Sequence, residues 1–146
     1  MGRSVAHPEY LSYRVKRLYL LVSQRIDDAL KPYGLARSQW QALFRVRHAG
    51  TLSQKDLQQA MQVESATLTC IVDVLSAKGW LERFQSAEDK RVRMLRLTPE
   101  GREKLERIPN PYKTVETRLL RGVSDADRAH ARTVLEAMIR NLEDRS

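Results

Sequence analysis

The order of local signals between residues 51 and 107 constrains the fold more than any other feature of the chain. Two helices are predicted here, over residues 53–61 and 64–78, with a tight turn between them. Ser53 can cap the first helix, because Asp56 follows it three residues later in a pattern close to a capping box. A glycine follows the second helix and is expected to end it.

A short β-hairpin is predicted next, with strands over residues 80–85 and 91–97 around a polar loop, although the alternation of apolar and polar residues is imperfect. The run Leu97-Thr98-Pro99-Glu100-Gly101 then starts a helix, since threonine caps and proline suits the first turn. Helix, turn, helix and an arginine-bearing hairpin is the layout of a winged helix-turn-helix, which docks on duplex DNA. The expected fold class is therefore mainly α with a small β-hairpin wing.

Further helices flank this segment on both sides. A long helix is expected from Tyr10 to Leu30 and a second from Ser38 to His48, closed by Gly50. A final helix is expected to begin at Ser124. The apolar stripe of the first helix comprises Leu11, Val15, Leu18, Tyr19, Val22, Ile26, Ala29 and Leu30. The stripe of the final helix comprises Ala131, Val134, Leu135, Met138, Ile139 and Leu142.

Two prolines interrupt the region between the hairpin and the final helix. Pro109 and Pro111 each lack the amide hydrogen that a helix interior needs, at a cost of roughly 3 kcal/mol. We therefore expect a kink or break between Ile108 and Pro111.

The formal net charge of +8 favours a polyanionic partner, either nucleic acid or an anionic membrane face. Most of the excess lies in residues 1–50, with nine basic and three acidic groups, whereas residues 51–107 hold ten and nine. The informative charge is local: Lys90, Arg91, Arg93 and Arg96 stand within seven residues that contain no acid.

The single cysteine cannot form an internal disulfide, which is typical of a reduced intracellular protein. The apolar run Leu18 to Val22 is too short to span a bilayer, and residues 1–8 lack the apolar core of a signal peptide. We expect a cytoplasmic protein with no membrane partner. The three histidines show no metal-ligand spacing with one another or with Cys70, so no metal and no cofactor are expected.

The helix over residues 64–78 is about 22 Å long, enough to lie in a major groove. Its outer face carries small and hydroxyl side chains, which allow close approach to base edges and phosphates. At the hairpin tip Asp89 can hold a neighbouring arginine in a fixed pose. Arg91 can then enter a minor groove while Lys90 binds phosphate.

The chain resembles the MarR family of transcriptional regulators. The resemblance lies in Leu52-Ser53-Gln54-Lys55-Asp56-Leu57, Ala66-Thr67-Leu68-Thr69, Val72-Asp73-Val74-Leu75, Lys78-Gly79-Trp80-Leu81-Glu82-Arg83, and Asp89-Lys90-Arg91 through Leu97-Thr98-Pro99-Glu100-Gly101. It implies a homodimer that presents two wings and two recognition helices to a pseudo-palindromic operator. It also implies one MarR-like domain over residues 1–146, with a helical dimerisation lobe formed by residues 1–35 and 108–146 and a winged-helix lobe of residues 36–107. The predicted DNA-contacting residues are Gln54, Ser65, Ala66, Thr67, Thr69, Cys70, Lys90, Arg91 and Arg93.

The resemblance further implies a pocket for a small aromatic acid or phenol, for which Tyr19, Trp40 and Phe44 are candidate lining residues. For any one of these aromatics, a place in the core is the competing interpretation. Cys70 stands where many members of the family carry arginine or another polar reader. It is either a passive small residue or a thiol whose oxidation disturbs docking.

Three functions therefore compete. The first is a dimeric, sequence-specific regulator, expected to be a repressor released by an effector. The second is a non-specific architectural DNA binder, whose affinity comes from phosphate contacts and depends steeply on salt. The third is an enzyme, which the sequence does not support, because it has no glycine-rich phosphate loop, no nucleophile near a histidine in sequence and no metal spacing.

Overall fold

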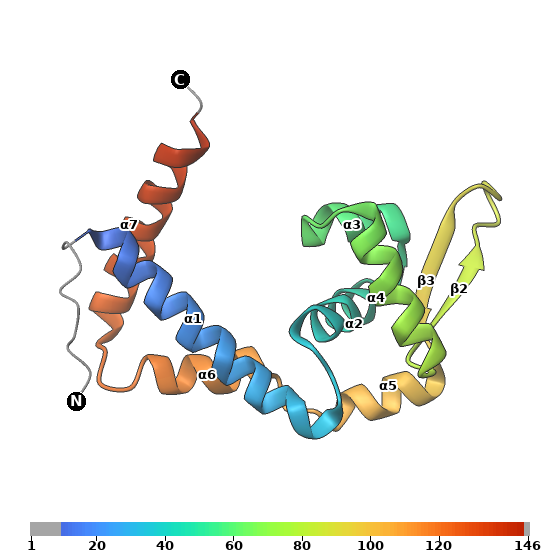
Figure 1. The fold of residues 1–146 in the computed structure, drawn as a ribbon, viewed down its shortest axis with the longest axis horizontal. Helices are drawn as coiled ribbons and strands as arrows, with labels where there is room; N and C mark the ends of the chain where they lie inside the picture. Colours follow the sequence, from blue (N-terminus) through green and yellow to red (C-terminus); the bar gives the residue numbers. More distant parts are fainter. Residues whose placement is uncertain (1–9, 145–146) are drawn as a thin grey trace, which may run out of the picture. The chain divides into compact units, whose positions relative to one another are not determined.

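A computed structural model of the chain describes residues 10–144. Within them it has seven α-helices, one short 3-10 helix and three strands (Figure 1). In chain order these are α1 (Leu11–Leu30), η1 (Lys31–Tyr33), α2 (Arg37–Ala49), β1 (Thr51–Ser53), α3 (Gln54–Met61), α4 (Ser65–Ala77), β2 (Leu81–Gln85), β3 (Arg93–Leu97), α5 (Pro99–Glu106), α6 (Pro111–Leu119) and α7 (Asp125–Glu143). The segment 1–8, in which no signal-peptide core is expected, lies outside the described residues.

The chain divides into two compact units. The first ends at Pro111 and the second begins at Tyr112, so α1 to α5 and all three strands belong to the first unit. The division into lobes expected from the sequence, residues 36–107 against 1–35 and 108–146, stays a prediction.

The three strands form one antiparallel sheet in the order β1-β3-β2. Leu95, at the centre of β3, lies opposite Leu52 on one side and Arg83 on the other. The hairpin of β2 and β3 agrees with the sequence prediction, whereas β1 was not predicted. Its three residues are too few for their alternation to predict a strand, and they become one by pairing with a segment more than forty residues away.

The hairpin strands are shorter than the sequence suggested. β3 begins at Arg93 instead of Arg91, because the backbone amide of Arg91 donates to the Asp89 carboxylate within the loop, at 3.0 Å. β2 begins at Leu81, since the amide of Trp80 bonds the carbonyl of Leu75 and closes α4. The loop between the strands is therefore a structured turn and not an extension of the ladder.

The core of the first unit gathers under the sheet and between α2, α3 and α4. Figure 1 shows these three helices packed as a group, with the β2–β3 hairpin beside α4. The expected inner stripe of α4 is buried, and burying each leucine stabilises the fold by roughly 2 kcal/mol. Side chains with no accessible surface include Leu43, Val46, Leu57, Leu68, Val72, Leu75 and Leu95.

The run from Leu97 to Gly101 locks the start of α5 against the turn between α4 and β2. The Thr98 hydroxyl accepts from the amide of Gly101 at 2.9 Å, as a helix cap, and donates to the carbonyl of Gly79. A Cβ at position 101 would collide with the backbone carbonyl of Trp80, so only glycine fits there. The cap was predicted from the sequence, and the close approach explains why glycine follows it.

Within the single chain, the expected stripe of α1 is buried only in its second half and that of α7 is not buried. In α1 only Ser23, Ile26 and Leu30 are buried, and the stripe from Leu11 to Tyr19 is exposed. In α7 no residue is buried. Among residues 10–144, no helix is both long and apolar enough to cross a membrane.

The predicted break between the hairpin and the final helix is present. α5 ends at Glu106, α6 begins at Pro111, and the two prolines flank Asn110 in the gap. A proline disfavours helical geometry in the residue before it, which accounts for the position of the break. The final helix starts as expected, with the Ser124 hydroxyl accepting from the amide of Asp127 at 3.1 Å.

Candidate nucleic-acid interface

Helix α4 divides into a buried and an exposed face, as its sequence indicates. The inner residues Leu68, Ile71, Val72 and Leu75 pack in the core, and Ser65, Ala66, Thr67 and Cys70 are exposed. These four side chains are small, so a partner surface can approach the helix backbone closely there; Asp73, three residues after Cys70, is also exposed. This is the face expected to enter a major groove.

The N-terminus of α4 is open to a ligand from outside. Its N-cap residue, Glu64, makes no capping hydrogen bond with its side chain. The first backbone amides of the helix point along its axis and carry part of the positive end of the helix dipole. They can therefore donate to a phosphate oxygen.

Two of the predicted contact residues are hydrogen-bonded to each other. The Gln54 amide nitrogen donates to the Thr69 hydroxyl at 3.4 Å, and that hydroxyl donates to the carbonyl of Ser65 at 2.9 Å. Both side chains are partly buried. In this state they link α3 to α4, and their role as DNA contacts stays a prediction.

Arg83, which was not predicted to belong to this surface, contacts two of its elements. Its Nη2 donates to the Asp73 carboxylate on α4, and its Nε donates to the Gln54 amide oxygen at 3.3 Å. Asp73 lies one helical turn after Thr69, so the sequence could place these two on one face of α4. It gave no sign that β2 brings an arginine to that face.

At the tip of the hairpin, the Asp89 carboxylate holds Arg91. One carboxylate oxygen accepts from Nε at 3.1 Å and the other from Nη2 at 3.2 Å, and the first also accepts from the backbone amide. Hydrogen bonds from the Arg91 side chain, and then from its backbone, lower the pKa of Asp89 below its ordinary value. The arginine that Asp89 was expected to hold is therefore Arg91.

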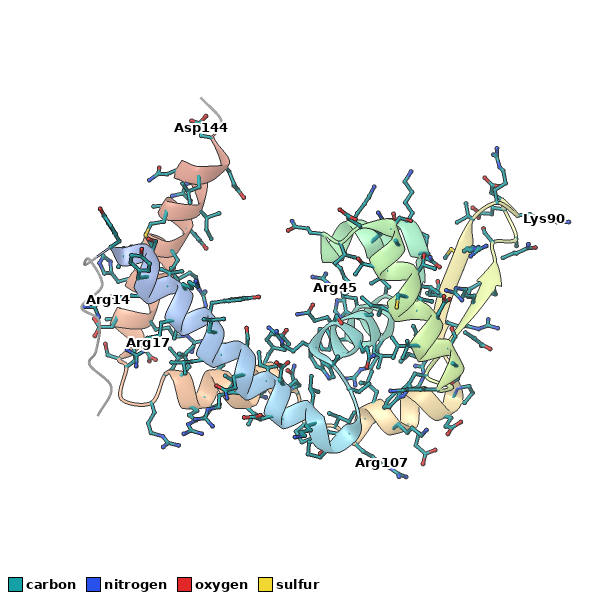
Figure 2. All side chains as sticks on the ribbon, viewed as in Figure 1. Arg14, Arg17, Arg45, Lys90, Arg107 and Asp144 are labelled. Atoms are coloured by element: carbon teal, nitrogen blue, oxygen red, sulfur yellow. The ribbon has the colours of Figure 1, made fainter. Side chains whose placement is uncertain are left out.

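The cations of the wing face outward. The Arg91 side chain is 90% exposed although Asp89 holds it, and Lys90 and Arg93 are exposed too. Figure 2 shows Lys90 at the tip of the hairpin, pointing away from the body of the first unit. These positive groups stand in the same unit as the exposed face of α4.

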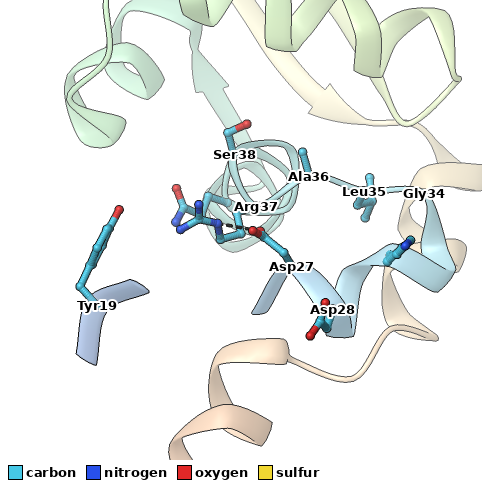
Figure 3. A pocket seen from close by; sticks show the side chains of 10 residues that line it. Tyr19, Asp27, Asp28, Gly34, Leu35, Ala36, Arg37 and Ser38 are labelled. Atoms are coloured by element: carbon cyan, nitrogen blue, oxygen red, sulfur yellow. Dashed lines mark ion pairs between the residues drawn. The ribbon is translucent and has the colours of Figure 1, made fainter. Parts of the chain in front are cut away.

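The candidate effector residues lie in two separate hollows of the first unit. Tyr19 lines a hollow of about 710 Å³ between α1 and α2, whereas Trp40 and Phe44 stack with ring centroids 4.9 Å apart and line another of about 180 Å³. In the larger hollow the Arg37 Nε is 2.7 Å from the Asp27 carboxylate, and Tyr19 lines the same hollow (Figure 3). The sequence did not single out Arg37.

Within residues 10–144, no three or more histidine, cysteine, aspartate or glutamate side chains are arranged to hold a metal ion.

Known proteins resemble this chain in sequence and in fold. Residues 35–92 match the sequence model of a family described as the MarR family. The chain is 32% identical over 119 residues to YwoH of Bacillus subtilis, an uncharacterised regulator described as HTH-type, and the match covers 82% of this chain and 86% of YwoH.

Two solved structures share the fold. One is a mutant of MarR from E. coli complexed with operator DNA, with a TM-score of 0.79, 22% identity, and coverage of 88% of this chain and 92% of that one. The other is the MepR–DNA complex of S. aureus, with a TM-score of 0.82, 21% identity, and coverage of 92% and 99%. These structures support the fold, and the sequence matches to the MarR family model and to YwoH show that the chain belongs to the MarR family, a family of transcription regulators and not of enzymes.

Proposed function

We propose that the chain acts as a homodimer that binds a pseudo-palindromic DNA operator and represses transcription until a small effector binds. The main support for DNA binding is that the first unit exposes two features together. These are the small-residue face of α4 and the outward-pointing side chain of Arg91. A helix of this kind fits the major groove, and a guanidinium held at a wing tip fits a narrow minor groove. Two proteins of the same fold, MarR and MepR, are known in complexes with DNA.

Exposed apolar side chains support the dimer. Tyr19 and Leu20 on α1 are 63% and 54% exposed, and Ile139 and Leu142 on α7 are 54% and 88% exposed. Apolar surface of this extent on regular helices is costly in water and marks an interaction site. A second copy of the chain is the proposed occupant, because a two-fold dimer would present two α4 helices to one duplex.

The hollow between α1 and α2 is the proposed effector site. Arg37 and Tyr19 face it, and a guanidinium beside a phenol can bind the carboxylate and ring of a small aromatic acid. Such a ligand would compete with Asp27 for Arg37. Salicylate is a suitable probe: it should release operator DNA from the wild type, and Arg37→Ala should abolish the release without weakening operator binding.

Footprinting tests the DNA proposal. Duplexes selected from a random library by the wild type should share a pseudo-palindrome, with half-sites one helical turn, about 34 Å, apart. DNase protection should then cover about two turns. Protection of every duplex alike, with a steep dependence on salt, would contradict the proposal and support an architectural DNA binder.

A further inference from the structure

Arg83 links three elements of the first unit through one guanidinium. It lies in β2, its Nη2 binds Asp73 in α4, and its Nε donates to Gln54 in α3 at 3.3 Å. The side chain is 27% exposed, and its charge faces the carboxylate of Asp73. Arg91 is also paired with a carboxylate, that of Asp89, but its side chain is 90% exposed.

The Gln54 side-chain amide continues the chain of hydrogen bonds into α4. Its oxygen accepts from Arg83 and its nitrogen donates to Thr69 at 3.4 Å. The Thr69 hydroxyl in turn donates to the carbonyl of Ser65, the first residue of α4. Because oxygen and nitrogen have different partners, the amide of Gln54 is held in one orientation.

The position of this network matters because α4 and the wing are connected along the chain at one end only. The connection runs from Ala77 through Trp80 into β2. Asp73 and Thr69 lie four and eight residues before the end of α4, or about 6 and 12 Å along its axis at 1.5 Å per residue. Arg83 therefore ties the hairpin directly to Asp73, about one turn from the junction, and through Gln54 to Thr69, which lies in the half of α4 away from the junction.

We infer that Arg83 is a positioning residue for DNA recognition, which holds the wing and α4 at the spacing that lets Arg91 and the exposed face of α4 enter adjacent grooves together. This inference rests on the proposed operator binding. It assigns Gln54 and Thr69 a role within the network. It also separates Arg83 from the cations that contact phosphate.

The decisive variant is Arg83→Lys. A lysine keeps the charge but has one ammonium group, which cannot reproduce the fork between Asp73 and Gln54. Operator affinity should fall by roughly 10-fold, the effect of about one charge-assisted hydrogen bond. Affinity for a scrambled duplex should not change. The matched control is Arg107→Lys, which alters an ion pair with Glu103 at the C-terminal end of α5 and should leave both affinities at the wild-type value.

A second readout separates positioning from general stability. If Arg83 sets the spacing, Arg91→Ala should weaken operator binding clearly in the wild type but much less in the Arg83→Lys background, because the wing is already out of place. Equal losses in the two backgrounds would overturn the inference. If Arg83→Lys fails to fold, Asp73→Asn tests the same network, with a smaller loss of operator affinity expected and no loss for the scrambled duplex.

Salt dependence tests the competing role, a direct phosphate contact. Arg83→Gln should leave the slope of log affinity against log salt unchanged, whereas loss of a phosphate contact would reduce its magnitude by about 0.9. If the wild type prefers its operator and Arg83→Lys does not change that preference, the inference about Arg83 is wrong but the proposed function stands. A wild type without any operator preference would instead overturn the proposed function.

Discussion

Helices α4 and α7 carry apolar stripes of similar spacing, yet one is buried in the chain and the other is not. Leu68 and Leu75 on α4 have no accessible surface, whereas Leu135 and Ile139 on α7 are 45% and 54% exposed. The stripe of α4 meets α2, α3 and the sheet within its own unit. Among the residues that the structure describes, the regular elements of the second unit are α7 and nearly all of α6, and α6 leaves the stripe of α7 exposed.

The difference shows what helical periodicity can and cannot establish. A stripe at three- and four-residue spacing indicates that one side of a helix will be covered. It does not tell whether the covering surface comes from the same chain or from another. For α7 we propose another copy, and the two helices should therefore respond differently to substitution.

The largest effect is expected inside α4. Leu68→Ala should lower the free energy of unfolding by about 3 kcal/mol, since it leaves a cavity in a packed core. Urea denaturation followed by circular dichroism measures this loss, relative to wild type at the same protein concentration. A loss below about 1 kcal/mol would contradict the burial of this stripe.

The next effect is expected on α7. Ile139→Asp should weaken self-association by roughly 100-fold, because a carboxylate would be buried in an apolar interface. Sedimentation equilibrium should then give a mass near 16.9 kDa, against twice that mass for the wild type. Glu136→Ala on the same helix is the control and should sediment as the wild type does. Unchanged association of Ile139→Asp would show that α7 is not the interface.

Local features were the ones that the sequence predicted well. The caps at Ser53, Thr98 and Ser124 all form, with each hydroxyl accepting a backbone amide three residues later. Each cap depends on residues within one helical turn of each other, so a short stretch of sequence is enough to predict it. The break at Pro109 and Pro111 was predictable for the same reason.

Features that depend on distant parts of the chain were missed. Strand β1 exists because it pairs with β3, and the requirement for Gly101 comes from the carbonyl of Trp80. The link between Arg83 and Asp73 joins a strand to a helix. No periodicity or cap in the sequence shows that such residues meet.

The wing should affect DNA binding and not folding. Arg91→Ala should weaken operator binding by about 10-fold, as expected for one arginine in a groove. Its unfolding transition should stay at the wild-type value, because the side chain is almost fully exposed. Fluorescence anisotropy with labelled duplexes measures the first, and thermal denaturation measures the second. Undiminished operator binding would remove the wing from the interface.

The smallest effect concerns the acid titration of the wing tip. Because Arg91 lowers the folded-state pKa of Asp89 below the ordinary value of 3.8, the ion pair is fully formed above that value. It is lost as the pH falls through the lowered folded-state pKa. NMR titration of the Asp89 carboxyl should show the lowered pKa, and Arg91→Ala should return it toward the ordinary value. An identical titration in both proteins would contradict the pairing.

The most direct test of operator recognition is the ratio of affinities of the wild type for its selected operator and for a scrambled duplex of the same length, at one salt concentration. Specific recognition by α4 and the wing predicts a ratio of about 1,000 or more. A ratio near one would contradict it, because phosphate contacts alone bind every duplex alike.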